Sequence, residues 1–335
     1  MKRERVRQAP EKKKNRILFF DLIRILCVAV IVYAHLQYAF VPGLNSLLFA
    51  DGYLPLNFYT AGLQGWAVYG LILVSGAVLE YNYQQITGFV NYTRFQFRRF
   101  VRLYPAFWMS LVFGLLVNIL LTSSGALQII RENIFYILFE YTGFFIILGK
   151  GPGFINIMGW FIATIVCLYL LFPYLSDLIR RYRLPAILGL MVISFGSRSL
   201  FYSYSSVLPD AFWMWFPLCN VFEFGLGIYL IQNSLYPKND QEYPLIHEIA
   251  ELSYYVFLFH VIIIQVFHTP TWFSTWFSGA VEQQFQGLPV LGYTIWYLAV
   301  EVMVIIVSVA AMAADRSVQR LLRRNHQIGS YLKKA

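Results

Sequence analysis

Long apolar stretches with few charges dominate this sequence. A transmembrane helix needs about 20 mostly apolar residues. Eight stretches approach or exceed that length: 17–40, 59–80, 104–121, 155–175, 185–201, 211–232, 251–268 and 290–312. Only 13% of the 335 residues are charged and 59% are hydrophobic, against about 25% and about 45–50% in soluble domains. That is too little charge to cover a soluble surface, so the sequence predicts an all-α, polytopic bundle of transmembrane helices.

A further apolar piece, 132–148, is ambiguous because it contains Glu132 and Glu140 and is interrupted by Gly143. Cytoplasmic loops of membrane proteins carry an excess of Lys and Arg. If this piece enters the membrane without crossing it, the basic clusters at 94–102, at 180–183 and at both chain ends all fall on the cytoplasmic side. We therefore expect eight full spans with both termini cytoplasmic. A different division of the long stretches gives ten spans.

Basic residues are concentrated at the two ends of the chain. Residues 1–16 hold eight Lys and Arg residues, and residues 315–335 hold six. We expect a basic cytoplasmic N-terminal tail (1–16), a transmembrane domain (17–312) that starts with an uncleaved helix, and a basic cytoplasmic C-terminal tail (313–335). A nucleic-acid binder would carry such charge on a folded polar domain, and none is visible. The tails are therefore expected to contact anionic membrane lipid, not nucleic acid.

The first apolar stretch carries three ionisable residues, Asp21, Arg24 and His35. Ionisable groups within a membrane are costly, so each is a functional hypothesis. Arg24 and His35 are eleven residues apart, which places them within about 20° on one helical face and roughly 16 Å apart along it. Asp21 lies one turn before Arg24, where the two can pair. We interpret His35 as a candidate general base and Asp21 chiefly as the partner of Arg24.

The third apolar stretch is preceded by four arginines, Arg94, Arg98, Arg99 and Arg102. Such charge also sets topology, a strong alternative for Arg94. Arginine forks suit bidentate contacts with phosphate, however. The cluster, together with Arg24, predicts a receptor for a phosphorylated cytoplasmic ligand.

The other polar candidates are weaker singly. Ser253 and His260 share a helical face, and Glu223 lies inside an apolar stretch, where a structural hydrogen bond and a site role are equally open. Trp160 is expected near the outer interface. The three cysteines form no CxxC pair, and no metal, P-loop or dinucleotide motif occurs, so we expect no bound metal and no permanently bound cofactor.

Several segments, taken together and in order, resemble the acyltransferase-3 family, bacterial integral-membrane proteins that acylate surface glycans and other exported acceptors. The resemblance covers about residues 17–312. It is carried by Asp21-x-x-Arg24 with His35, Ser75-Gly76, Arg98-Arg99-x-x-Arg102-Leu103-Tyr104-Pro105, Trp160-Phe161 with Leu171-Phe172-Pro173, Phe224-Gly225-Leu226-Gly227, and Ser253-Tyr254-x-x-Phe257-Leu258-x-His260. The chain departs from many members in having no acid within 160–166.

The resemblance implies that Arg24 and His35 are an essential pair, with Asp21 orienting Arg24. It implies that Arg98, Arg99 and Arg102, with Tyr104 beside them, bind the acyl donor, and that the donor is acyl-CoA, with acetyl-CoA as co-substrate. Ser253, His260, Glu223 and Trp160 are then either on the acceptor side or structural.

The hypothesis is a multi-pass acyltransferase of the cell (cytoplasmic) membrane. It would O-acetylate a polysaccharide or other glycan of the cell envelope, either directly, through an acyl-histidine, or through a partner protein. The alternative is an exporter or flippase for a glycan or lipid-linked intermediate, which transfers no acyl group. A flippase needs no acyl-CoA, so dependence on acyl-CoA separates the two.

Overall fold

The computed structural model describes residues 17–49, 56–83, 86–121, 126–148, 153–208, 212–237, 243–268, 272–284, 289–325 and 328–329. Within these ranges the chain is helical and contains no strand, so the all-α prediction is confirmed. The helices are α1 (Leu18–Phe49), α2 (Leu56–Asn82), α3 (Phe89–Leu121), α4 (Ala126–Glu132), α5 (Ile134–Thr142), η1 (Phe145–Leu148), α6 (Gly159–Tyr182), α7 (Leu184–Ser203), α8 (Phe212–Trp215), η2 (Pro217–Asn220), α9 (Val221–Gln232), α10 (Pro244–His268), α11 (Trp272–Gln284) and α12 (Pro289–Arg324).

Seven helices in the described part of the chain are long and apolar enough to cross a membrane. These candidate spans are Leu18–Leu36, Leu63–Asn82, Phe89–Leu121, Gly159–Tyr182, Leu184–Ser203, Pro244–Phe267 and Thr294–Arg324. They correspond to seven of the eight predicted spans, and they make the chain a multi-pass membrane protein.

The remaining predicted span, 211–232, is wrong, because this segment is not one continuous helix. The segment is divided into α8, the short 3₁₀ helix η2 and α9. The break lies at Phe216 and Pro217, where Phe216 is extended (φ −65°, ψ 134°). Proline lacks an N–H and disfavours helical geometry in the residue before it, which accounts for the break here, whereas α3 and α6 each continue through an internal proline, Pro105 and Pro173.

The ambiguous piece 132–148 forms α5 and the 3₁₀ helix η1, separated at Gly143. Gly143 adopts a left-handed conformation with φ 71° and ends α5. Nine residues of α-helix are about 14 Å long, less than half of the roughly 30 Å hydrocarbon core. This piece is therefore too short to span by itself, in keeping with the re-entrant or interfacial element expected there.

Two helices are longer than the sequence predicts. α3 begins at Phe89 and contains the whole arginine segment, and α12 continues to Arg324 through the first part of the expected C-terminal tail. Their 33 and 36 residues correspond to roughly 50 Å each, well beyond the hydrocarbon thickness. Both helices therefore carry their arginines on extensions that a bilayer need not enclose.

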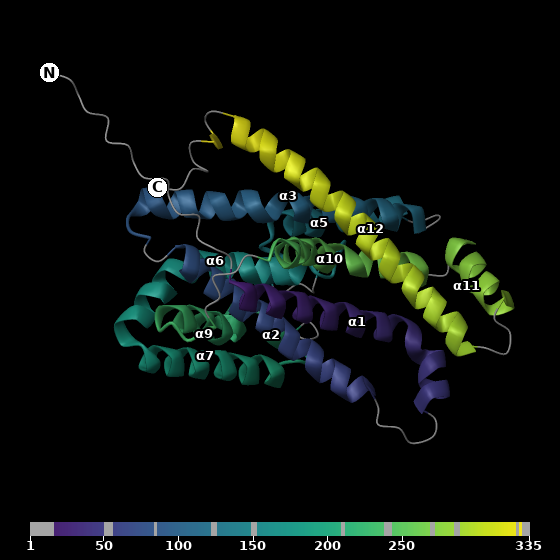
Figure 1. The fold of residues 1–335 in the computed structure, drawn as a ribbon, viewed down its shortest axis with the longest axis horizontal. Helices are drawn as coiled ribbons and strands as arrows, with labels where there is room; N and C mark the ends of the chain where they lie inside the picture. The colour runs from purple at the N-terminus through teal and green to yellow at the C-terminus, as the bar shows by residue number, and fades with distance from the viewer. Residues whose placement is uncertain are drawn as a thin grey trace.

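The helices run mostly along the long axis of the molecule, and α12 crosses the bundle obliquely (Figure 1). α1 packs against α2 and α10, α2 against α9, and α10 against α12. The contact between α2 and α9 is close because glycines line it. A Cβ at Gly76 would overlap the carbonyl oxygen of Phe224, and one at Gly227 would overlap that of Leu73. Two segments that resemble the family thus pack directly on each other.

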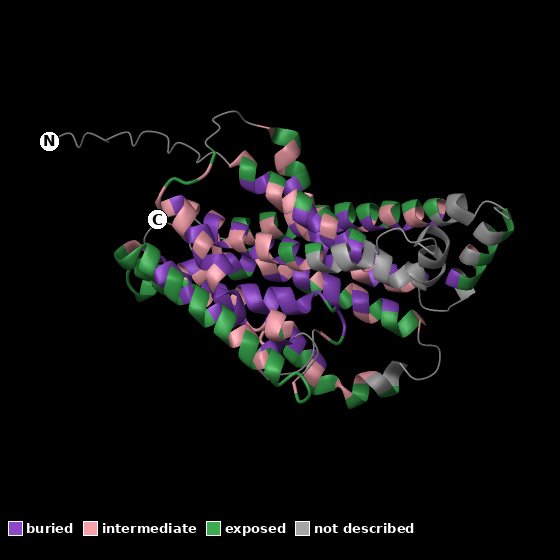
Figure 2. Cartoon of the chain, turned by 90° about the horizontal axis from the view of Figure 1, so that it is seen from below, coloured by how far each residue is buried: buried purple, intermediate pink, exposed green. Residues whose placement is uncertain are grey.

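Figure 2 shows buried residues along the middle of the bundle and exposed residues on its outward faces. The exposed faces include large apolar side chains such as Leu120, Val192 and Ile306. A soluble protein rarely exposes so much contiguous apolar surface. A hydrocarbon environment accommodates these faces.

Candidate active site

The polar residues of α1 occupy two levels of the bundle. Nearer its start, the Asp21 carboxylate pairs with Arg24 at 3.4 Å and with Nδ1 of His247, from α10, at 2.7 Å. Asp21 is buried, so this contact fixes Arg24 and joins α1 to α10. The predicted pairing of Asp21 with Arg24 is present in the structure, and His247 is a further partner.

Further along α1, His35 faces His260 of α10. Nδ1 of His35 lies 3.2 Å from Nε2 of His260, and the two ring centroids are 5.0 Å apart. Nδ1 of His35 also lies 2.9 Å from the carbonyl oxygen of Ile31, and its Nε2 lies 3.1 Å from the amide nitrogen of Gln64 on α2. His260 is fully buried and its Nδ1 faces the carbonyl oxygens of Val256 and Phe257. We call His35 and His260 the histidine pair.

These contacts assign the protons of the histidine pair. The partners of His260 Nδ1 among the described residues are two carbonyl oxygens, so this nitrogen carries the hydrogen and Nε2 accepts. Nδ1 of His35 then carries a hydrogen, which it shares between Nε2 of His260 and the carbonyl oxygen of Ile31. Nε2 of His35 carries no hydrogen, and its electron pair accepts a hydrogen bond from the amide of Gln64. Both rings satisfy their partners as neutral imidazoles. The basic nitrogen of His35 therefore points towards Gln64, where an incoming hydroxyl can replace the amide donor.

A buried carboxylate supports the helix that carries His260. Glu140 of α5 accepts hydrogen bonds from the backbone N–H groups of Phe154, Ile155 and Asn156, at 2.9–3.0 Å. The side chain of Asn156 in turn donates to the carbonyl oxygen of Leu258, two residues before His260, at 2.9 Å. Burial raises the pKa of the Glu140 carboxyl above its usual range, and the three N–H donors act in the opposite direction.

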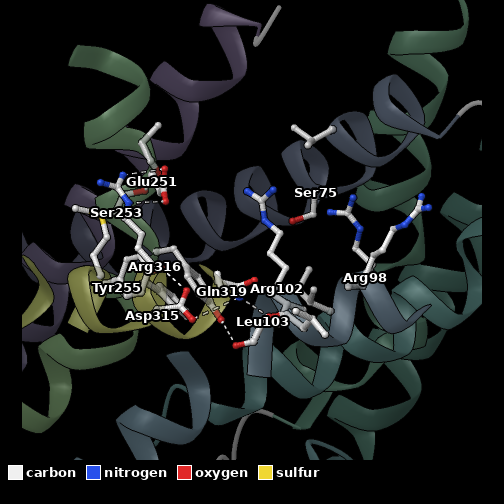
Figure 3. Close-up of a pocket in the computed structure, with 18 of the residues that line it drawn as sticks. Ser75, Arg98, Arg102, Leu103, Glu251, Ser253, Tyr255, Asp315, Arg316 and Gln319 are labelled. Carbon is white, nitrogen blue, oxygen red and sulfur yellow. Dashed lines mark hydrogen bonds and ion pairs between the residues drawn. The ribbon is translucent and has the colours of Figure 1, made fainter. Parts of the chain in front are cut away.

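A large cavity lies at the other end of α1, beside Arg24. Its volume is about 1500 Å³, above the roughly 300–1,000 Å³ of typical small-molecule sites. We call it the arginine cavity because seven arginines from three helices line it: Arg24, Arg98, Arg99, Arg102, Arg316, Arg320 and Arg323. In Figure 3 the Arg102 side chain extends between Ser75 and Arg98 on one side and Arg316 with Glu251 on the other.

Most of the charge of this cavity is positive and partly uncompensated. Arg102 forms no ion pair within the described part of the chain, and its side chain is exposed. Arg99 is buried, stacks over the ring of Tyr83 at 4.6 Å, and has no hydrogen-bond partner for Nε among the described residues. Of the two acids in the lining, Asp315 accepts a hydrogen bond from the hydroxyl of Tyr255 at 2.6 Å, and Glu251 pairs with Arg316 at 3.1 Å. The cavity therefore suits a ligand with several negative charges.

Two tyrosines after Ser253 hold the walls of the arginine cavity together. The Tyr254 hydroxyl donates to the carbonyl oxygen of Leu103 on α3 at 2.9 Å, and the Tyr255 hydroxyl donates to Asp315 on α12. Ser253 itself lines the cavity and donates to the backbone of Ala250. The segment predicted from its resemblance to the family thus joins α3 and α12 through α10.

Two phenylalanines separate the arginine cavity from the histidine pair. Phe161 of α6 and Phe257 of α10 both line the cavity, and their ring centroids are 4.8 Å apart. The Phe257 ring lies 6.1 Å from the ring of His260. Val28 of α1 also lines the cavity. It lies on the same helical face as His35, and His35 is roughly 10 Å further along the helix. The apolar layer between the cavity and the histidine pair is therefore thin and includes the rings of Phe161 and Phe257.

Three predicted site residues lie elsewhere among the described residues. The hydroxyl of Tyr104 donates to the carbonyl oxygen of Thr142 at 2.7 Å, away from the cavity lining. Trp160 is buried against Trp215, with centroids 6.3 Å apart. Glu223 pairs with Arg198 at 2.8 Å. No group of three His, Cys, Asp or Glu side chains in the described ranges is placed to hold a metal ion.

Four residues near the site were not singled out for it by the sequence. Gln64 and Asn156 are polar residues in or beside apolar runs, a signal that is too common to select them. Glu140 and His247 are ionisable residues within or next to apolar stretches, and the cost of such groups in a membrane could have drawn attention to them. Their partners are distant in sequence and emerge only from the fold.

Comparison with known proteins gives one match. The sequence model of one protein family, described as an acyltransferase domain of the acyltransferase-3 type, matches residues 17–246, more than half of the chain. No curated protein and no solved structure matches. The matched region contains α1 to α9, and thus Arg24, His35 and the arginines of α3, whereas His260 and α12 lie beyond it.

Proposed function

Because the chain belongs to the acyltransferase-3 family, we propose that it moves an acetyl group from acetyl-CoA to a hydroxyl of a cell-surface or exported glycan. One observation carries the proposal. A single face of α1 presents Arg24 to the arginine cavity and His35 to the histidine pair. Donor binding and proton transfer are thereby aligned along one helix.

The donor binds in the arginine cavity as a co-substrate. Coenzyme A carries three phosphate groups at one end and the thioester at the other, so it needs cations at one end of a long site. Arg99 and Arg102 supply charge that no carboxylate of the described residues neutralises, and arginine forks match phosphate oxygens. By the excess of basic residues on cytoplasmic segments, this end of the bundle faces the cytoplasm.

The chemical step takes place at His35. Its Nε2 accepts the proton of the acceptor hydroxyl as the hydroxyl oxygen attacks the thioester carbonyl carbon. The C–O bond forms, the C–S bond breaks, and the coenzyme A thiolate leaves with the proton that His35 took. In a two-step course, Nε2 of His35 attacks the thioester carbonyl carbon, so that a C–N bond forms and the C–S bond breaks. The acceptor hydroxyl oxygen then attacks the acetyl-histidine, the C–N bond breaks, and the hydroxyl proton goes to the coenzyme A thiolate.

His260 acts as a positioning residue. It accepts the Nδ1 hydrogen of His35 and so holds the Nε2 electron pair of His35 towards Gln64. When His35 takes a proton at Nε2, its Nδ1–H remains hydrogen-bonded to His260, which stabilises the imidazolium that forms. The acceptor approaches from the side of Gln64, on α2.

The acceptor is placed on the far side of the membrane from the donor. The histidine pair lies beyond Phe161 and Phe257 from the cavity, which supports a route that crosses much of the cell membrane. Transfer to the glycan is either direct or through a partner protein.

The test uses the full-length protein in nanodiscs. Wild type should bind acetyl-CoA and release free coenzyme A, and Arg102→Ala should weaken donor binding by at least about tenfold, the loss expected for one charged hydrogen-bond partner. Arg181→Ala is the matched control, since Arg181 is exposed and pairs with Asp177 away from the cavity. Failure of a well-folded wild type to bind acetyl-CoA would overturn the proposal and favour glycan export.

A further inference from the structure

The end of α12 carries a row of arginines that face the arginine cavity. Arg316, Arg320 and Arg323 are spaced by four and three residues, which places them on one helical face, and all three line the cavity. The next residue, Arg324, is exposed and does not line it. Arg320 and Arg323 are themselves exposed, so the distinction is one of helical face: three of these four arginines lie on the face of α12 that borders the cavity, and Arg324 lies off it.

Two hydrogen bonds fix this part of α12 against its neighbours. The side-chain amide of Gln319 donates to the carbonyl oxygen of Val101, the residue before Arg102 on α3. Asp315 accepts from Tyr255 of α10. Figure 3 shows Arg316, Asp315 and Gln319 on the wall of the cavity that faces Arg102. The arginines of α12 thus complete a site that α3 begins.

The three arginines differ in their charge partners. Arg316 pairs with Glu248 at 2.6 Å and with Glu251 at 3.1 Å, so its charge is compensated. Within the described ranges, Arg320 donates to neutral groups of its own helix, the carbonyl oxygen of Arg316 at 3.3 Å and the hydroxyl of Ser317 at 3.1 Å. Among the described residues, no carboxylate pairs with Arg320 or Arg323. We call Arg320 and Arg323 the α12 arginines. Because no carboxylate of the described residues neutralises them, they are available to bind another anion.

We propose that the α12 arginines bind the ribose 3′-phosphate of coenzyme A, an inference that rests on the proposed function. The order of groups along the donor gives this assignment. The thioester must reach His35, so the pantetheine arm runs inward and the diphosphate meets Arg99 and Arg102. The nucleotide end then lies at the exposed rim, where the α12 arginines are. This segment lies outside the region that matches the family.

An anionic lipid headgroup offers the same phosphate chemistry, because basic residues that follow a transmembrane helix also attract anionic lipid. The experiment distinguishes the nucleotide phosphate from the lipid headgroup by supplying each without the other. Nanodiscs of phosphatidylcholine alone contain no anionic lipid, and nanodiscs with phosphatidylglycerol contain no nucleotide unless it is added.

The test measures binding of adenosine 3′,5′-bisphosphate to the full-length protein in phosphatidylcholine nanodiscs by calorimetry. Adenosine 5′-monophosphate, which lacks the 3′-phosphate, is the comparison ligand. Arg320→Ala combined with Arg323→Ala should weaken bisphosphate binding by at least about tenfold, and should change monophosphate binding by less than about twofold. Arg324→Ala is the matched control and should leave both affinities within about twofold of wild type.

The inference is wrong if wild type does not bind the bisphosphate, or if the double variant binds it with the same affinity as wild type. It is also wrong if the double variant differs from wild type only in its thermal stability in phosphatidylglycerol nanodiscs. The last result assigns the α12 arginines to lipid. Acetyl-CoA turnover is measured in parallel. A wild type that binds the bisphosphate through these arginines and yet consumes no acetyl-CoA removes the proposed function and leaves the phosphate site standing.

Discussion

The arginine cavity and the histidine pair lie along the same helix, and their polar groups have opposite surroundings. Around the cavity, Arg102 has no ion-pair partner within the described residues, and Nε of Arg99 has no hydrogen-bond partner. Around the histidine pair, each ring nitrogen faces a hydrogen-bonding atom. The cavity therefore has positive charge that is not neutralised by the described residues, whereas the histidine pair is neutral and its hydrogen bonds are satisfied.

This difference separates two tasks. A site that must bind and release a polyanion benefits from cations that remain available, because pairing them internally would cancel the attraction. A general base must instead be held in one tautomer and one orientation. Substitutions in the two regions should therefore affect different kinetic constants, the donor KM for the cavity and kcat for the histidine pair.

The largest effect is expected for His35→Ala. Removal of the base should lower kcat for acetyl transfer by about 10²–10⁴-fold and leave acetyl-CoA binding close to that of wild type, since His35 does not line the cavity. Steady-state transfer rates and donor calorimetry in nanodiscs measure both. A variant with more than about a tenth of the wild-type rate would place the chemistry at another residue.

A smaller loss is expected at His260, and two variants distinguish positioning from packing. His260→Leu removes the acceptor for Nδ1–H of His35 and should lower kcat by about 10–100-fold through misorientation. His260→Gln places an amide oxygen where that acceptor was and should recover most of the rate. The pH profile of kcat should move in His260→Leu and return towards wild type in His260→Gln. Equal losses in both variants, with no change of profile, would reduce His260 to a packing role.

Local features of the site could be predicted from the sequence, because they depend on helical spacing and charge. The face shared by Arg24 and His35, the Asp21 pairing and the arginine segment of α3 are all of this kind. The contact of His35 with His260 joins residues that are 225 positions apart, and no spacing rule reaches so far. For the same reason the sequence left Glu223 open between a structural and a site role, whereas the structure shows its pairing with Arg198.

The sequence was least informative where one pattern serves two purposes. Basic residues after an apolar stretch set topology, so residues 313–335 were assigned to a tail. The structure instead extends α12 to Arg324 and turns three of its arginines into the cavity. Apolar composition likewise predicted one helix over 211–232, although Pro217 lies within it. Composition thus indicates well whether a segment lies in an apolar environment, but it indicates poorly whether the segment forms one continuous helix.

Glu140→Gln tests how the histidine pair is held in place. The amide can accept some of the N–H groups of Phe154, Ile155 and Asn156 but not all, so one buried donor loses its acceptor. We expect the free energy of unfolding to fall by about 1–3 kcal/mol, with a several-fold loss of kcat and no change in donor KM. Thermal unfolding and kinetics in the same nanodiscs report both. A raised KM with unchanged kcat would show that this support serves the cavity.

The smallest effect is expected for Tyr255→Phe, on the cavity side. The variant removes the hydroxyl that donates to Asp315 at 2.6 Å and loosens α12 from α10. Gln319 remains as a second link between α12 and α3, so donor binding should weaken by no more than about fivefold, as for one neutral hydrogen bond. Tyr174→Phe, at an exposed tyrosine of α6, is the control. Because Tyr255 contacts the cavity wall and not the histidines, a fall in kcat at unchanged KM would contradict the separation of the two regions along α1.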